Sequence, residues 1–358
     1  MKARTKMKAV LGVAVVALAC LVLNAGAKEI PDTLPDPGHE AVDTSAPVQV
    51  YILLGQSNMV GAGHVKGNKE GSLEYAVKEK DKYPYLVDDQ GNWTRRKDVR
   101  YTFTMGSGKG KGNIKNNAWM SIEGNGRIGP EFGIGYYLGH ALDERVLILK
   151  SCIGNRSLGW DLLPPGSEQY EFEKNGKTLV HAGYGDSPKM WEKGTEPKEI
   201  GWYAGMQYDG DVNRAKKVLK NLQKYYPGAE EYEIAGFFWW QGDKDRYNAI
   251  HARRYEHNLV NLIKTLRKDF DAPEAKFVCA TLGQTEKGAG GNEGRILDAM
   301  FAVSNPEKHP EFKGDVATVY SHPLCHGGAS NGHYGGNAET YMDIGEGMGK
   351  AMIRLLEK

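Results

Sequence analysis

The chain has 358 residues, of which 40% are hydrophobic and 25% are charged, as in an ordinary soluble globular protein with a sizeable core. Its formal net charge is only +1, and no basic patch remains beyond the N-terminal region, so nucleic acid is excluded as an expected partner. The 46 glycines exceed the usual share and predict long, tight loops.

The first 27 residues predict a secretory signal peptide. Four basic residues within the first eight precede the apolar run 9–23, and the small residues Ala25-Gly26-Ala27 follow it. The run is shorter than the roughly 20 residues of a membrane span. Cys20 raises the alternative of a lipid anchor, but apolar residues continue after it. We therefore expect cleavage after Ala27, a secreted or periplasmic location, no stable membrane insertion, and a net charge that falls from +1 to −3.

Residues 28–47 are rich in proline and acidic residues and predict a flexible leader before a domain that spans residues 48–358. Three cysteines remain after signal cleavage, so at most one internal disulfide is possible. Cys152 and Cys279 lie in or beside apolar runs, and we expect two buried thiols there. The third is Cys325.

Apolar runs typical of strands alternate with helical patterns along this domain. Helical patterns precede the second, third and fourth runs, and another closes the chain at 337–358. The alternation predicts a parallel sheet with helices on both faces. Two long insertions of little periodicity, 64–127 and 156–208, follow strand ends. The expected strands are 48–54, 146–149, 234–240, 277–282 and, more weakly, 316–320.

Polar turns follow three of these strands, at 55–59, 151–155 and 241–243, and should meet at one edge of the sheet. Ser57, on a strand-to-helix turn, would have an exposed hydroxyl close to backbone N–H groups, as a nucleophile requires. A simple helix N-cap is the alternative. His333, in the loop before the last helical pattern, is the candidate general base, although it could also be a loop histidine without a role.

Four motifs in this order and spacing, GQSNM, GPEFGIG, WWQGDKD and HYGGNAETYMDIG, resemble those of the SGNH-hydrolase superfamily. Within it, residues 48–356 resemble the sialate O-acetylesterase-like group and carbohydrate esterase family six. The resemblance implies a three-layer, flavodoxin-like α/β fold and ester hydrolysis without a metal. It also implies Ser57 as nucleophile, His333 as base, and oxyanion donors at Ser57, Gly154 and Gln241.

The third member of the catalytic set remains open at this point. Many SGNH enzymes carry an Asp-x-x-His motif, but the residue three before His333 is Ser330. Some relatives take the acid from a Gln-Gly-Glu motif, and the matching residue here is Asp243. The alternatives are Asp245, or no acid at all, with Ser330 or a backbone carbonyl holding the imidazole.

A zinc site is a rival interpretation of the same region, because His322, Cys325, His326 and His333 lie within twelve residues. Their spacing fits no regular structural-zinc pattern. We therefore expect neither a metal nor a cofactor.

These observations predict an exported carbohydrate O-acetylesterase, a carboxylic ester hydrolase that acts through an acyl-enzyme on acetylated glycans such as xylan or sialic acid. The alternatives are a non-catalytic carbohydrate-binding relative and another SGNH esterase or lipase. Neither the glycan nor the oligomeric state follows from the sequence. Five aromatic residues in or beside the insertions could stack on sugars or only pack the loops: Trp119, Trp160, Trp191, Trp202 and Tyr203.

Overall fold

The computed structural model describes residues 45–357, so the predicted signal peptide and most of the predicted leader lie outside the described residues. The strands are β1 Val48–Gly55, β2 Gly63–His64, β3 Val99–Met105, β4 Asn113–Trp119, β5 Arg127–Ile128, β6 Val146–Ser151, β7 Tyr170–Lys174, β8 Lys177–His181, β9 Met190–Glu192, β10 Tyr232–Trp240, β11 Lys276–Ala280 and β12 Val316–Val319. The α-helices are α1 Ser57–Val60, α2 Leu73–Lys80, α3 Glu131–Ala141, α4 Met206–Leu219, α5 Leu222–Tyr225, α6 Ala249–Asp269, α7 Gly291–Val303 and α8 Ala338–Leu356.

The main sheet has seven strands in the order β12-β11-β10-β1-β6-β3-β4. All neighbours are parallel except β3 and β4, which are antiparallel. The five strands predicted from the sequence lie side by side from β12 to β6 in the order of a flavodoxin-like sheet, which confirms the predicted fold class. The chain order reverses between β1 and β10, and ligands of such sheets bind outside the strand ends at that point.

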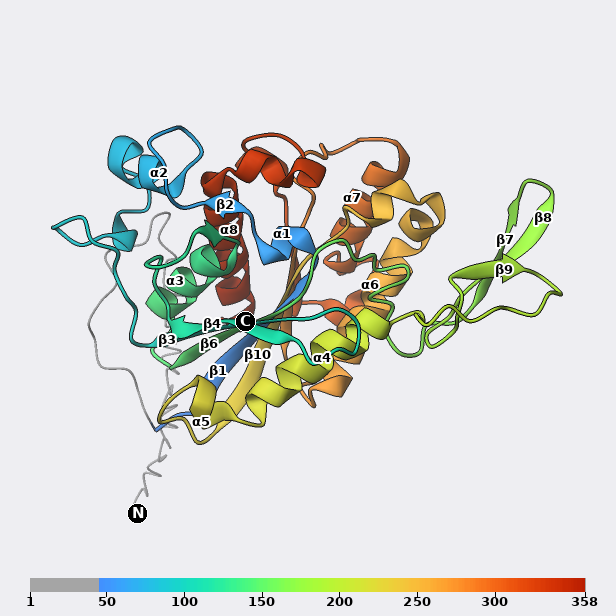
Figure 1. Cartoon of the computed structure of the whole chain (residues 1–358), viewed down its shortest axis with the longest axis horizontal. Helices are drawn as coiled ribbons and strands as arrows, with labels where there is room; N and C mark the ends of the chain where they lie inside the picture. The colour runs from blue at the N-terminus through green and yellow to red at the C-terminus, as the bar shows by residue number, and fades with distance from the viewer. Residues whose placement is uncertain (1–44, 358) are drawn as a thin grey trace, which may run out of the picture. The chain divides into compact units, whose positions relative to one another are not determined.

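Helices cover the sheet on both faces, as Figure 1 shows. Strand β1 is apolar and buried along nearly its whole length, as expected for a strand covered on two sides. Side chains alternate between the faces of a strand, so Val50, Ile52 and Leu54 join the core under α4, α6 and α7. Tyr51 and Leu53, which alternate with them, are equally buried.

The insertions contain more regular structure than the sequence predicts. The first supplies β3 and β4 to the main sheet, and the second forms a separate three-stranded sheet, β7-β8-β9. Strand β4 is mostly exposed and polar because it lies at the sheet edge, so it lacks the apolar pattern of a buried strand. Helix α7 was also not predicted from the sequence.

The two buried thiols expected at Cys152 and Cys279 are confirmed, and both are free, as is the partly buried Cys325. Burial raises the pKa of Cys279 to about 12. Among residues 45–357, no helix has the length and apolar character needed to span a membrane.

Candidate active site

The turn after β1 brings Ser57 to the carboxyl edge of the sheet at the switch point. Gly55 pairs with Trp240, so strands β1 and β10 end at the same level. A Cβ added to Gly55, whose φ is 148°, would lie 2.4 Å from the carbonyl oxygen of Trp240. Only glycine fits this close approach and this backbone conformation. The half-buried Ser57 then begins the short helix α1.

The turn after β6 lies directly against Ser57. A Cβ added to Gly154 would lie 3.3 Å from the Cβ of Ser57, so the two backbones approach closely. Backbone N–H groups near a serine hydroxyl are the groups that can stabilise an oxyanion. The predicted proximity of Ser57 and Gly154 is therefore present in the fold, while their catalytic roles stay predictions.

The buried side chain of Gln241 joins these turns to the turn after β10. Its Nε2 lies 2.6 Å from Asp245 Oδ2, 2.9 Å from the Arg156 carbonyl oxygen and 3.1 Å from Gln56 Oε1. Its Oε1 accepts a hydrogen bond from the Tyr255 hydroxyl at 2.8 Å. Two amide hydrogens thus face three acceptors, so one contact must open before Gln241 can donate to an oxyanion. That donor role stays a prediction.

Asp243 contacts the loop that carries His333 through one hydroxyl group. Ser330 Oγ donates to Asp243 Oδ1 at 2.6 Å, and Arg246 Nε donates to the same oxygen at 2.8 Å. Ser330 occupies the position where an Asp-x-x-His enzyme has its acid, so the carboxylate of Asp243 reaches that position from another turn. Within the described residues, Asp243 and His333 make no direct hydrogen bond, and the role of Asp243 stays a prediction.

The loop around His333 has an unusual backbone conformation and is held in place by contacts of the next residue, Tyr334. His333 and Tyr334 have φ values of 51° and 54°, in the left-handed region that non-glycine residues seldom adopt. The Tyr334 ring stacks on Trp240 with centroids 5.7 Å apart, and its hydroxyl accepts from Asn58 Nδ2 at 3.3 Å. These contacts bring His333 to the edge that carries Ser57, although the two side chains share no hydrogen bond in the described structure. Hydrogen bonds between catalytic groups are often looser without substrate.

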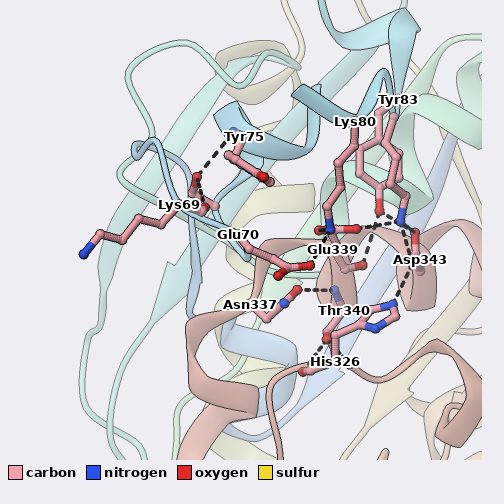
Figure 2. Close-up of polar contacts among 12 residues, drawn as sticks. Lys69, Glu70, Tyr75, Lys80, Tyr83, His326, Asn337, Glu339, Thr340 and Asp343 are labelled. Carbon is pink, nitrogen blue, oxygen red and sulfur yellow. Dashed lines mark hydrogen bonds and ion pairs between the residues drawn. The ribbon is translucent and has the colours of Figure 1, made fainter. Parts of the chain in front are cut away.

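A charged cluster holds the loop before α8 to the first insertion, as Figure 2 shows. Glu339 and Asp343 lie in the first turns of α8. Lys80 Nζ is 2.8 Å from Glu339 Oε1, and Lys82 Nζ is 3.2 Å from Asp343 Oδ2. On the loop side, His326 Nε2 lies 3.5 Å from Asp343 Oδ2. The first insertion therefore supports the segment from which the candidate base projects.

A buried ion pair lies beneath the serine turn and was not predicted from the sequence. Lys150 Nζ is 2.7 Å from Glu131 Oε2, and both side chains are almost fully buried. The same ammonium donates to the carbonyl oxygens of Met59 and Val60 at 3.2 and 2.9 Å. These carbonyls end α1 and would otherwise lack partners. A lysine within the apolar strand VLILKS is the sequence signal that could have revealed it.

The residues of the rival zinc interpretation make separate contacts. His322 Nδ1 lies 2.8 Å from the Gly283 carbonyl oxygen, whereas His326 faces Asp343. Burial raises the pKa of the Cys325 thiol to about 11, which disfavours the thiolate that a metal needs. In the part of the chain that the structure describes, no group of three His, Cys, Asp or Glu side chains could hold a metal ion.

Three of the five singled-out aromatic residues pack with one another. Trp160 belongs to a small core in the second insertion, and Trp191 and Trp202 pack against it. Trp119 packs edge-on against Tyr226 at 5.2 Å. The loop-packing interpretation therefore has structural support for these residues.

The parallel sheet of flavodoxin-like order, with serine, glycine and glutamine turns at its carboxyl edge, matches an SGNH-like esterase fold. The chain belongs to the family of carbohydrate esterases described as sialic acid-specific acetylesterases, whose family model matches residues 169–354. That range includes Gln241, Asp243 and His333, whereas Ser57 and Gly154 precede it. No curated protein sequence matches the chain.

Solved structures with low sequence identity are similar to the chain. XAC1771, a carbohydrate acetylesterase from Xanthomonas citri, is 12% identical with a TM-score of 0.51, over 85% of this chain and 55% of its own. The chain thus spans about half the length of XAC1771. A protein from Arabidopsis thaliana is 16% identical with a TM-score of 0.46, over 86% of this chain and 98% of its own. NanS is 14% identical with a TM-score of 0.38, over 77% of this chain and 78% of its own.

Proposed function

We propose that the chain is an exported carbohydrate O-acetylesterase in which Ser57 is the nucleophile. The observation that carries the proposal is the close approach of Gly154 to Ser57, with 3.3 Å between a Cβ built on Gly154 and the Ser57 Cβ. This approach brings the backbones of Ser57 and Gly154 together at the switch point of the sheet, which supports the proposal that their N–H groups act on one site. Such an arrangement suits a tetrahedral oxyanion that forms on the serine oxygen.

In the proposed reaction, His333 takes the proton of Ser57 Oγ as this oxygen bonds to the acetyl carbonyl carbon. The N–H groups of Ser57 and Gly154 and the amide of Gln241 stabilise the oxyanion. The bond between the carbonyl carbon and the sugar oxygen then breaks, and His333 returns the proton to that oxygen. Water, activated by His333, hydrolyses the acetyl-enzyme.

Asp243 is the proposed acid of this set. Its support is the 2.6 Å hydrogen bond from Ser330, three residues before His333. A carboxylate at this place can orient the imidazole and stabilise the imidazolium formed during attack. The competing partner is Arg246, which donates to the same carboxylate oxygen.

Export is proposed from residues 1–27, whose basic, apolar and small-residue segments are typical of a secretory signal. The proposed organisation is a signal peptide at 1–27, a leader at 28–47 and one esterase domain at 48–358. The proposed substrate is an acetylated glycan.

The test is acetate release by the mature chain from acetylated xylan, other acetylated polysaccharides and O-acetyl sialic acid, with Ser57→Ala as the control. We expect release from at least one substrate and a loss of several orders of magnitude in Ser57→Ala. Near-normal release by a folded Ser57→Ala protein would contradict the serine mechanism. Binding of a glycan without any release would instead support a non-catalytic relative, and a preference for long-chain esters would support a lipase.

A further inference from the structure

Asp245 is a fully buried carboxylate beneath the proposed site. It comes two residues after Asp243 but faces a different set of groups. Its Oδ2 accepts from Gln241 Nε2 at 2.6 Å, so it makes the shortest of the three contacts of that amide. A carboxylate accepts hydrogen bonds only, and the amide nitrogen of Gln241 must therefore point towards it. The orientation of Gln241 is thus fixed by Asp245 together with the Arg156 carbonyl oxygen, which also only accepts.

The same carboxylate also holds the segment that follows Gly154. Its Oδ2 accepts from the backbone N–H of Leu158 at 2.9 Å, and its Oδ1 accepts from that of Gly159 at 2.8 Å. A single side chain therefore connects two of the three predicted oxyanion donors, the Gln241 amide and the turn that begins at Gly154. Loss of Oδ1 would leave the N–H of Gly159 without its acceptor, whereas loss of Oδ2 would leave both the Gln241 amide and the N–H of Leu158 without theirs.

In the described part of the chain, no lysine or arginine forms an ion pair with this carboxylate, and a pair of histidines lies beside it. His181 Nδ1 lies 3.1 Å from the Ala182 carbonyl oxygen, which can only accept, so this nitrogen carries a proton. Burial lowers the pKa of His181 to about 4, and burial also lowers the pKa of His251 well below its usual range. Both rings are therefore neutral at pH 7. His251 Nε2 then donates to His181 Nε2 at 3.2 Å, and the bare His251 Nδ1 lies 3.5 Å from Asp245 Oδ1.

The neutral histidine pair leaves the charge of Asp245 to be stabilised by N–H donors alone. Charge-assisted hydrogen bonds of this kind are shorter and stronger than neutral ones. Because the donors belong to the two loops, the buried charge stabilises one relative position of these loops. A neutral side chain of the same shape would fix that position less strongly.

We infer that Asp245 is a positioning residue for ester hydrolysis, which holds the Gln241 amide and the turn after Gly154 in the geometry that receives the oxyanion. This inference rests on the proposed function. It assigns to Asp245 a role in positioning the oxyanion donors and leaves the orientation of His333 to Asp243.

The test compares Asp245→Asn with Asp161→Asn in the mature chain, with p-nitrophenyl acetate as substrate. Asp161 is the matched control because its Oδ2 accepts from the N–H and hydroxyl of Ser157, in the same loop, without contact to Gln241. We expect kcat of Asp245→Asn to fall by about 10²-fold, as when one oxyanion donor is lost, with KM nearly unchanged. Asp161→Asn should retain the kcat of the unaltered chain.

Binding of phenylboronic acid supplies a second readout that a merely structural role would not change. Its adduct with a serine is tetrahedral and anionic, like the transition state, so its affinity should fall with kcat in Asp245→Asn. Gln241→Leu should show a similar loss of kcat, and the double variant should lose less than the product of the two single losses, because both changes act on the Gln241 donor. Gln241→Leu also keeps the inference testable if Asp245→Asn does not fold.

Normal kcat and normal boronate affinity in folded Asp245→Asn, or in folded Gln241→Leu, would overturn the inference. Equal losses in Asp245→Asn and Asp161→Asn would do so as well, since loop support alone would then explain them. Failure of the proposed function is distinguishable, because the unaltered chain would then release no p-nitrophenol.

Discussion

The turns after β1 and β10 both lie over a buried ionisable side chain, but the two charges are stabilised in different ways. Under the serine turn, Lys150 is paired with Glu131 at 2.7 Å and donates to carbonyl oxygens of α1. Under the glutamine turn, Asp245 is held by N–H donors, and Nδ1 of His251 lies 3.5 Å from its Oδ1. One turn therefore rests on an ion pair and the other on an isolated charge.

The difference has consequences for stability and for pH. An ion pair in the interior becomes costly when one partner is removed, because the other charge remains buried and unpaired. An isolated buried carboxylate is sensitive to protonation, and burial raises the pKa of Asp245 to about 6 despite its hydrogen bonds to Gln241, Gly159 and Leu158. Substitution of one partner of the ion pair should thus destabilise the serine turn, whereas the stability of the glutamine turn should vary with pH.

The largest expected effect concerns the other carboxylate of the glutamine turn. If Asp243 orients His333, Asp243→Asn should lower kcat by up to about 10⁴-fold, as loss of the acid does in a serine protease. Ser330→Ala should cost far less, since it removes only the hydroxyl between the two segments. Steady-state kinetics with p-nitrophenyl acetate measures both, with circular dichroism as the folding control. A near-normal Asp243→Asn enzyme would show that the site works without this acid.

Lys150→Met should break the support of the serine turn. The substitution leaves Glu131 buried without its cation and should lower the free energy of unfolding by about 3–5 kcal/mol. Adding Glu131→Gln should restore much of this loss, because the amide carries no charge. Urea denaturation of the single and double variants measures the effect. Equal stability of the single variant and the unaltered chain would mean that the ion pair does not support this turn.

A smaller effect is expected on the pH dependence of stability. The pKa of Asp245 is about 6 in the folded chain against an ordinary value of 3.8, so the folded state binds more protons between these pH values than the unfolded state. The free energy of unfolding should therefore fall as pH rises from about 4 to about 6. Burial of Asp211, whose pKa rises to about 7, acts in the same direction.

Asp245→Asn should reduce this slope, because the asparagine does not titrate. Asp161→Asn should reduce it less, because the charge of Asp161 is only the smallest of the named causes that act on the pKa of Asp245. Urea denaturation at several pH values from 4 to 7 gives the slope directly. A slope of the same size in Asp245→Asn and in the unaltered chain would assign the pH dependence to other groups.

The centre of the fold could be predicted because its strands are nearly continuous apolar runs. β1 and β10 are buried on both faces, and the helices between the strands have clear patterns. The edge strand β4 could not be predicted in this way, since most of its residues face solvent and it pairs with only one neighbour, β3. The apolar sequence pattern identifies a strand because the strand's side chains are buried. The pattern therefore fails for a strand whose side chains are mostly exposed.

The candidate site shows the same limit at the level of single residues. Ser57, Gln241 and His333 follow from motifs, because each lies in a polar turn at the end of an element. The contact between Asp243 and Ser330 joins residues 87 positions apart, and no local pattern indicates it. The support of Lys150 for α1 spans 90 positions in the same way. Such contacts depend on how the turns meet in space.

The most direct test of the central claim is covalent labelling of the mature chain with a fluorophosphonate, followed by peptide mapping by mass spectrometry. A serine activated by a neighbouring base reacts with such a reagent, whereas an ordinary surface serine does not. We expect one modified residue, Ser57, and no labelling of Ser57 in a folded His333→Ala variant. An unlabelled protein with normal esterase activity, or a label on a different serine, would contradict the account.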